Sequence, residues 1–245
     1  MAGAAPMDDL TPILSQWPWE PGRLDVRRVQ GADGRLLFQV RVELGVLQLE
    51  SDGRPDGRAY QGHDSALACA RAGAVALGPT AVADLATEMG QRRQRALACA
   101  MLEDWVRVRR DAMDNLEAIE LIARRGADPS DRARFDGWRP HELAMRARAE
   151  AAIAVASGRR DLAQAALDAG LQAVRDAWIR MRRPELAENG PEVALLRALL
   201  DALTLKLPTS QRGELERRLQ QALAAENYEL AAILRDELRQ MGGRP

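Results

Sequence analysis

The chain has 245 residues, of which 47% are hydrophobic, 29% are charged and 4% are aromatic, and its formal net charge is −1. A chain of this length can bury a substantial core, and a charge this close to zero provides no overall attraction to nucleic acid or to an anionic membrane. Lys206 is the only lysine among the basic residues; we interpret the excess of arginine as the codon bias of a GC-rich genome.

The sequence predicts a soluble cytoplasmic protein. Its first residues, MAGAAPMDDL, lack the basic segment and apolar run of a signal peptide. No apolar stretch approaches the roughly 18 residues that are needed to cross a bilayer. Cys69 and Cys99 lie among alanines in helical stretches, which is typical of small buried side chains in a reducing compartment.

We expect a flexible N-terminus over residues 1–15 and a small β-sheet over residues 16–62. Apolar and polar residues alternate from 36 to 44, which predicts a strand with one face toward water. The core face would carry Leu36, Phe38, Val40, Val42 and Leu44, and the wet face Gln39, Arg41 and Glu43. The phase changes at Gly45, which predicts a bulge or bend there. A partner strand around Val26 would make this a β-hairpin or a three-stranded sheet.

Residues 63–207 predict an array of helical hairpins, so the expected fold class is α-rich α+β. The predicted helices cover 64–77, 80–102, 104–125, 139–157, 161–182 and 191–205, with loops over 126–137 and 184–190. Three similar turns, at 102–105, 159–162 and 225–228, favour an array resembling tetratricopeptide (TPR) repeats, and an irregular helix bundle is the alternative.

The last segment, residues 208–245, predicts two short helices that fold back on each other. Apolar residues recur at spacings of three and four on both sides of Glu226-Asn227, and so short a break permits only an antiparallel hairpin. Two helices of this size cannot bury a core of their own. The hairpin must therefore dock on its own chain, on a second copy or on a partner.

This segment also resembles the UVR motif, the hairpin through which the repair proteins UvrB and UvrC meet and which Clp-type chaperones and their adaptors also carry. The resemblance lies in Leu215, Leu219 and Ala222, then in 226–229, 231–232, 235–236 and Leu238. It implies protein–protein contact rather than catalysis. The implied partner-binding residues are Leu219, Tyr228, Ala231, Ala232, Arg235, Asp236 and Leu238. The stretch GRPDG at 53–57, after the strand region, and Arg139-Pro140 at the start of a middle helix give the whole chain a resemblance to an uncharacterised bacterial family of helical proteins that end in this motif.

Nothing in the sequence indicates an enzyme, and we expect no cofactor and no metal. The chain has no phosphate-binding loop, no nucleophile elbow and no zinc-binding His motif. Its two histidines, His63 and His141, lie far apart without Cys or His at ligand spacing.

We therefore expect a non-catalytic adaptor or scaffold that binds a protein through its terminal hairpin, with a Clp-type chaperone, a repair protein or a second copy as the partner. Three alternatives stay open: the hairpin can cap the array, the chain can be an enzyme with an unrecognised site, or it can be a DNA-associated accessory factor in nucleotide excision repair or stress response. The last would use weak, non-specific phosphate contacts from Arg92, Arg93, Arg95, Arg107, Arg109 and Arg110. For these arginines a mixed solvated face is the simpler expectation. Trp17 and Trp19 would cover the apolar face of the sheet or lock it to the helices; exposed, they would instead anchor a partner.

Overall fold

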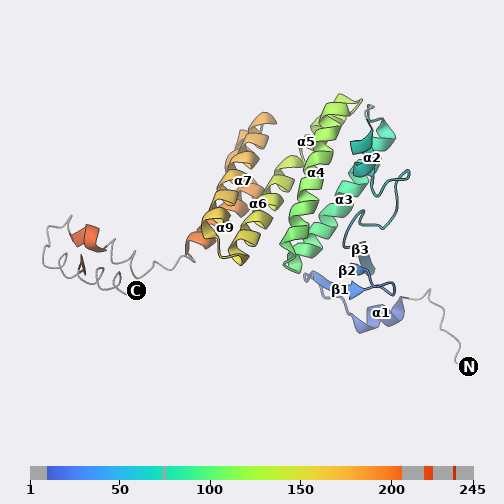
Figure 1. Ribbon diagram of the computed structural model, residues 1–245, viewed down its shortest axis with the longest axis horizontal. Coiled ribbons are helices and arrows are strands. Elements are labelled where there is room, and N and C mark those ends of the chain that lie inside the picture. Colours follow the sequence, from blue (N-terminus) through green and yellow to red (C-terminus); the bar gives the residue numbers. More distant parts are fainter. Residues whose placement is uncertain (1–9, 74–75, 206–217, 223–233, 236–245) are drawn as a thin grey trace, which may run out of the picture. The chain divides into compact units, whose positions relative to one another are not determined.

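The structure is a computed structural model that describes residues 10–73, 76–205, 218–222 and 234–235 (Figure 1). It is mainly helical, with a three-stranded antiparallel sheet near its N-terminus, and this confirms the predicted α-rich α+β class. The chain divides into two compact units, Met1–Arg197 and Ala198–Pro245. The strands are β1 (Asp25–Gln30), β2 (Leu36–Val42) and β3 (Gly45–Glu50). The helices are α1 (Thr11–Gln16), α2 (Ala66–Ala72), α3 (Pro79–Met101), α4 (Trp105–Arg125), α5 (Pro129–Asp136), α6 (Arg139–Ala156), α7 (Arg160–Arg180), α8 (Pro184–Asn189) and α9 (Pro191–Leu205).

The sheet packs one face against the helices. Its order is β1-β2-β3, and β2 pairs with both neighbours through Val40, which lies opposite Val26 and Leu47. Phe38 and Val40 are buried as predicted, in a cluster with Cys99 of α3 and other helical residues. The alternation of β2 therefore attaches the sheet to the turn between α3 and α4.

The predicted bulge at Gly45 is wrong, because the chain reverses direction just before it. Val42 pairs directly with Gly45, so Glu43 and Leu44 form a two-residue hairpin turn. Leu44, expected in the core, is 89% exposed at the tip of this turn, and Val42 is 42% exposed. The change of phase in the sequence marks the end of one strand and the start of the next.

Arg41 was expected to face water, but it is only 6% exposed. Its guanidinium donates to the backbone oxygens of Trp17 at 2.6 Å and Gly45 at 2.9 Å. The indole of Trp17 donates in turn to Asp25 at 2.7 Å and lies 4.1 Å from the guanidinium of Arg27. Residues 25, 27 and 41 lie on one face of the sheet, and Val40 lies on the other. Trp17 therefore covers the polar face of the sheet and not the apolar one.

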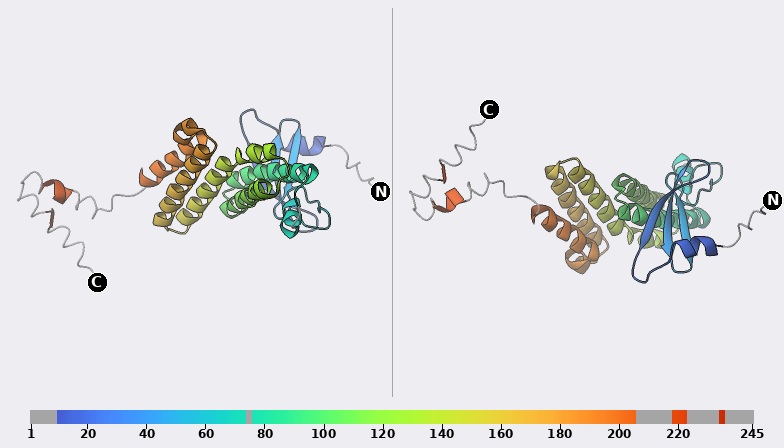
Figure 2. Two further views of the ribbon diagram at one scale, coloured as in Figure 1. Left: turned by 90° about the horizontal axis from the view of Figure 1, so that it is seen from above. Right: turned by 90° about the horizontal axis from the view of Figure 1, so that it is seen from below.

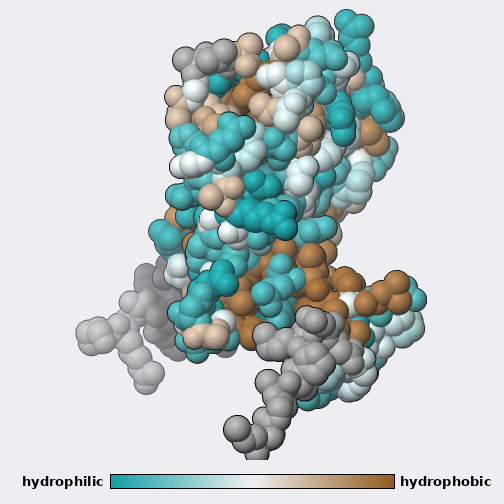
Figure 3. Space-filling model, turned by 90° about the vertical axis from the view of Figure 1, so that its right-hand side faces the viewer, coloured by the Kyte–Doolittle hydropathy of each residue, from teal (hydrophilic) through white to brown (hydrophobic). Residues whose placement is uncertain are grey.

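Hydrophobic side chains gather on the lower part of the face shown in Figure 3, where the sheet and α1 lie. Leu10 and Ile13, at the start of the chain's first helix, are 51% and 41% exposed. The short helix α1 overlaps the flexible N-terminus predicted over residues 1–15 and was not foreseen.

Helices α3, α4, α6 and α7 lie side by side in chain order (Figures 1 and 2), and α3–α4, α4–α6 and α6–α7 are in contact. Helices α6 and α7 approach closely, because a Cβ on Gly170 would overlap the Cβ of Ala147. A helical array is therefore present, while its likeness to tetratricopeptide repeats stays a prediction.

Two short helices replace predicted loops. Helix α5 lies within 126–137, where the Asp128 carboxylate accepts from the Ser130 N–H at 2.7 Å and Phe135 is buried. Helix α8 lies within 184–190 and begins at Pro184. Proline in a first helical turn is a start signal, but both segments are too short and polar for the helical period to show.

Candidate functional site

The terminal unit carries the predicted interaction site. Residues 218–222 and 234–235 are helical, and Ala222 and Leu234 are 4% and 3% exposed. They form one cluster with the partly buried Leu219. Leu219 and Ala222 are three residues apart on one helix face, so the described parts of the two segments contact each other, while the hairpin itself stays a prediction because residues 223–233 lie outside the described residues.

Of the predicted partner-binding residues, the structure describes two. Leu219 packs inside the hairpin, against Ala222 and Leu234, and Arg235 is exposed. The other five residues, Tyr228, Ala231, Ala232, Asp236 and Leu238, lie outside the described residues. The binding role of the whole set stays a prediction.

The six arginines proposed for phosphate contacts differ in how far they are buried. Arg92 and Arg95 of α3 are 2% and 1% exposed. Arg95 binds both oxygens of the fully buried Asp111 of α4, at 2.8 and 2.7 Å. Arg92 is hydrogen-bonded to the buried Glu88. The expectation of a mixed solvated face is thus wrong for Arg92 and Arg95, whose charges lie in the helical core.

Arg95, Arg107 and Arg110 hold the polar loop that leads from β3 toward α2. Arg95 donates to the backbone oxygens of Glu50 at 3.0 Å and Gly53 at 2.8 Å. Arg107 and Arg110 donate to the backbone oxygen of Ser51 at 3.2 and 2.7 Å. A loop without regular structure needs such donors, because its buried carbonyl groups have no partners in a helix or sheet.

Asp52 lies at the outer end of this arrangement. It accepts from Arg110 at 2.5 Å and from Arg107 at 3.2 Å. Partial burial opposes its ionisation, but hydrogen bonds from Ser51, Arg110 and Arg107 hold the pKa of Asp52 well below its usual range. Arg107 and Arg110 therefore already bind a carboxylate of their own chain.

The two remaining arginines differ in their surroundings. Arg93 donates to the buried Glu142 of α6 at 2.7 Å and lies 4.7 Å from the ring of Trp138. Arg109 is exposed on α4. Five of the six arginines thus bind carboxylates within the fold, although contacts to phosphate by this group stay a prediction.

The described residues contain no cluster of His, Cys, Asp and Glu able to hold a metal. His63 pairs with Tyr60 through its backbone, its N–H donating to the Tyr60 oxygen at 2.8 Å. Cys99 is fully buried, and this burial raises the pKa of its thiol to about 12. No helix in the described part of the chain is long and apolar enough to cross a membrane.

Comparison with known proteins identifies the terminal segment. The UvrB/uvrC motif matches residues 210–242, so the chain carries this motif at the position that the resemblance indicated. Searches of curated proteins and of solved structures return no significant match. The wider resemblance to a bacterial family stays a prediction.

Proposed function

We propose that the chain is a non-catalytic adaptor whose terminal hairpin binds a helical segment of another protein. The UvrB/uvrC motif at residues 210–242 carries this proposal. A hairpin with this motif presents apolar and charged groups on two short helices, which suits the docking of a second helical hairpin.

The length of the hairpin supports the same conclusion. Among the described residues Leu219, Ala222 and Leu234 pack together, and two helices as short as those predicted cannot bury a large core of their own. Contact with a partner would supply this burial. Tyr228 and Arg235 would then give specificity through a hydrogen-bonding aromatic group and a charge.

The partner classes that we propose are a Clp-type chaperone, a repair protein or a second copy of this chain. We propose the cytoplasm as its location, since such partners reside there. The DNA-associated alternative gains no support from the arginines, because Arg92, Arg93, Arg95, Arg107 and Arg110 bind carboxylates of the chain itself.

The test compares proteins that co-purify with the full-length chain and with the double variant Tyr228→Ala/Arg235→Ala. We expect a partner that the double variant loses, because its specificity contacts are removed. The matched control is Gln220→Ala/Gln221→Ala, which changes two exposed side chains of the same hairpin and should retain the partner. Binding between the purified proteins, measured by calorimetry, completes the test.

Truncation separates the adaptor from a structural cap. A chain ending at Leu207 should lose the partner yet melt at the same temperature as the full-length chain, because the hairpin contributes to binding and not to the array. Unchanged partners together with a lower melting temperature would contradict the proposal and indicate a cap.

A further inference from the structure

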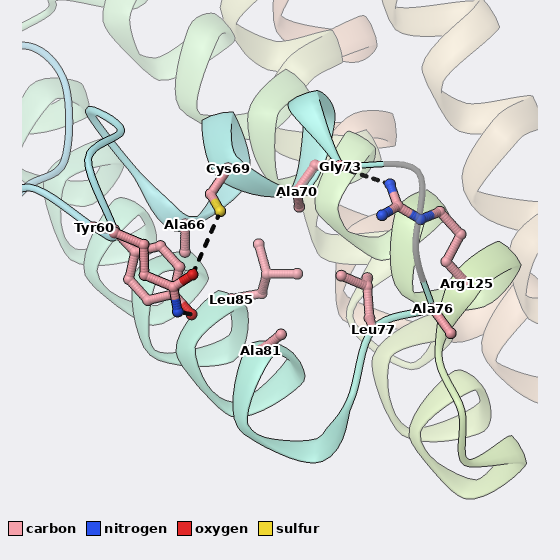
Figure 4. A pocket seen from close by; sticks show the side chains of 11 residues that line it. Tyr60, Ala66, Cys69, Ala70, Gly73, Ala76, Leu77, Ala81, Leu85 and Arg125 are labelled. Atoms are coloured by element: carbon pink, nitrogen blue, oxygen red, sulfur yellow. Dashed lines mark hydrogen bonds between the residues drawn. The ribbon is translucent and has the colours of Figure 1, made fainter.

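A hollow of about 290 Å³ lies between α2 and the first two turns of α3 (Figure 4). Its walls are apolar and include Ala66 and Ala70 of α2 and Ala81 and Leu85 of α3. Tyr60 and Cys69 lie at one end and Arg125 at the opposite end, and Gln61 contacts both Tyr60 and Cys69. The residues that line it all belong to the first compact unit, and the proposed adaptor function does not use them.

Small side chains create this hollow. Ala66 and Ala70 lie four residues apart on one face of α2, and Gly73 follows directly after the end of this helix, so small residues line this side of the hollow. Protein interiors are otherwise closely packed, with few voids. A cavity of about 150 Å³ accommodates benzene, so a hollow of about 290 Å³ has room for a planar molecule of two fused rings.

The polar end of the hollow is organised by a chain of hydrogen bonds. Tyr60 donates its hydroxyl hydrogen to Asp84 at 2.7 Å, and Gln61 donates from its amide to the Tyr60 oxygen at 3.2 Å. A phenol keeps its proton at neutral pH even at its usual pKa of about 10, and the hydrogen bond to Asp84 raises the pKa of Tyr60 to about 12. The direction of every bond in this chain is therefore fixed.

Gln61 is the residue that can recognise a ligand. Its backbone has a φ of +48°, because Gln61 and Gly62 form the two-residue turn between the paired Tyr60 and His63, and such a turn holds both central residues at positive φ. Its amide has two N–H groups, and the bond to Tyr60 uses one of them. Its carbonyl oxygen lies 3.9 Å from the Cys69 sulfur, a weak contact. One donor and one acceptor thus remain for a bound molecule.

We propose that this hollow binds a planar two-ring molecule whose edge carries an N–H group beside a carbonyl, as in an aromatic lactam. The ligand carbonyl would accept from the second N–H of Gln61, and the ligand N–H would donate to the Gln61 oxygen. The ring system would lie between the alanines of α2 and α3. An apolar slot with a few fixed polar groups is the usual composition of a small-molecule site.

Cys69 supplies a reporter at the site itself. The chain has two cysteines, and the other, Cys99, is fully buried with a raised thiol pKa. Monobromobimane should therefore label the full-length protein at Cys69. We expect 2-quinolone to slow this labelling by about tenfold at ten times its Kd, because only the unbound fraction reacts. Quinoline, which lacks both the N–H and the carbonyl, should bind at least about fivefold more weakly.

Two variants and a control, studied by calorimetry, locate the binding. Ala81→Leu fills the hollow and should abolish 2-quinolone binding, whereas Ala83→Leu, at an exposed position of the same helix, should leave it intact. Gln61→Leu should lower the affinity for 2-quinolone to that for quinoline. The proposal is overturned if 2-quinolone fails to protect Cys69, if Ala81→Leu binds it as tightly as Ala83→Leu, or if Gln61→Leu leaves its affinity unchanged.

Discussion

At the scale of the residue, the main feature of this fold is charge buried in pairs. Arg95 and Asp111 are 1% and 0% exposed, and two hydrogen bonds join them. Burying such a pair removes water from both the guanidinium and the carboxylate, which costs free energy. The third nitrogen of Arg95, Nη1, offsets part of this cost by donating to the backbone oxygens of Glu50 and Gly53. The pair therefore fixes the loop after β3 against α3, rather than adding a large net stability.

Asp111→Asn should lower the free energy of unfolding by about 3–5 kcal/mol, because it leaves the Arg95 charge buried without a counter-charge. Urea denaturation measures this loss. Asp168→Asn, at an exposed position of α7, is the matched control and should change stability by under about 0.5 kcal/mol. The double variant Arg95→Met/Asp111→Leu should be more stable than Asp111→Asn; a double variant as unstable as the single one would argue against an uncompensated charge as the cause.

At the scale of the element, the contact between α6 and α7 depends on one missing side chain. Alanine normally stabilises a helix by about 1 kcal/mol relative to glycine. Gly170→Ala should do the reverse and destabilise by about 1–3 kcal/mol, because its Cβ would overlap that of Ala147 and force the helices apart. Thermal melting followed by circular dichroism would measure the change.

Gly90→Ala in α3 is the matched control. No atom lies within 4 Å of a Cβ built at Gly90, so this substitution should raise stability through helix propensity alone. Equal effects of the two substitutions would show that the helices adjust freely at Gly170.

The same elements show how far the sequence predicts the fold. The periodicity of residues 79–101 and 105–125 is long enough to place α3 and α4 within a few residues. The helices α1, α5 and α8 have six to eight residues each and span too few turns to show a period.

The sequence does not predict the burial of Arg92 and Arg95, because their spacing is that of a surface face. Their carboxylate partners come from another turn and from another helix. The hollow beside Gln61 also depends on tertiary contacts, although the alanine and glycine spacing of α2 is a signal for it.

At the scale of the whole molecule, the free energy of unfolding should depend on pH through two carboxyl groups. Folding lowers the pKa of one of them and raises the pKa of the other. Arg71 holds the pKa of Glu117 below its usual range through a hydrogen bond of 2.7 Å. The ionised Glu117 therefore stabilises the fold above its unfolded pKa of about 4.3. This stabilisation is lost as the pH falls through the lower pKa that Glu117 has in the folded protein. Burial raises the pKa of Glu142, although Arg93 opposes the shift. The ionised form of Glu142 therefore lowers stability above the unfolded pKa, and protonation removes this cost as the pH falls.

Glu142→Gln tests this second behaviour, because glutamine resembles the protonated acid. Its stability relative to the unmodified protein should increase as the pH rises from 4 to 7, since only the carboxylate acquires a buried charge over that range. Urea denaturation at several pH values measures the difference. Glu188→Gln, at an exposed position, should give a difference that does not vary with pH. A difference that shrinks toward pH 7 for Glu142→Gln would instead mean that the ion pair with Arg93 outweighs the cost of burial.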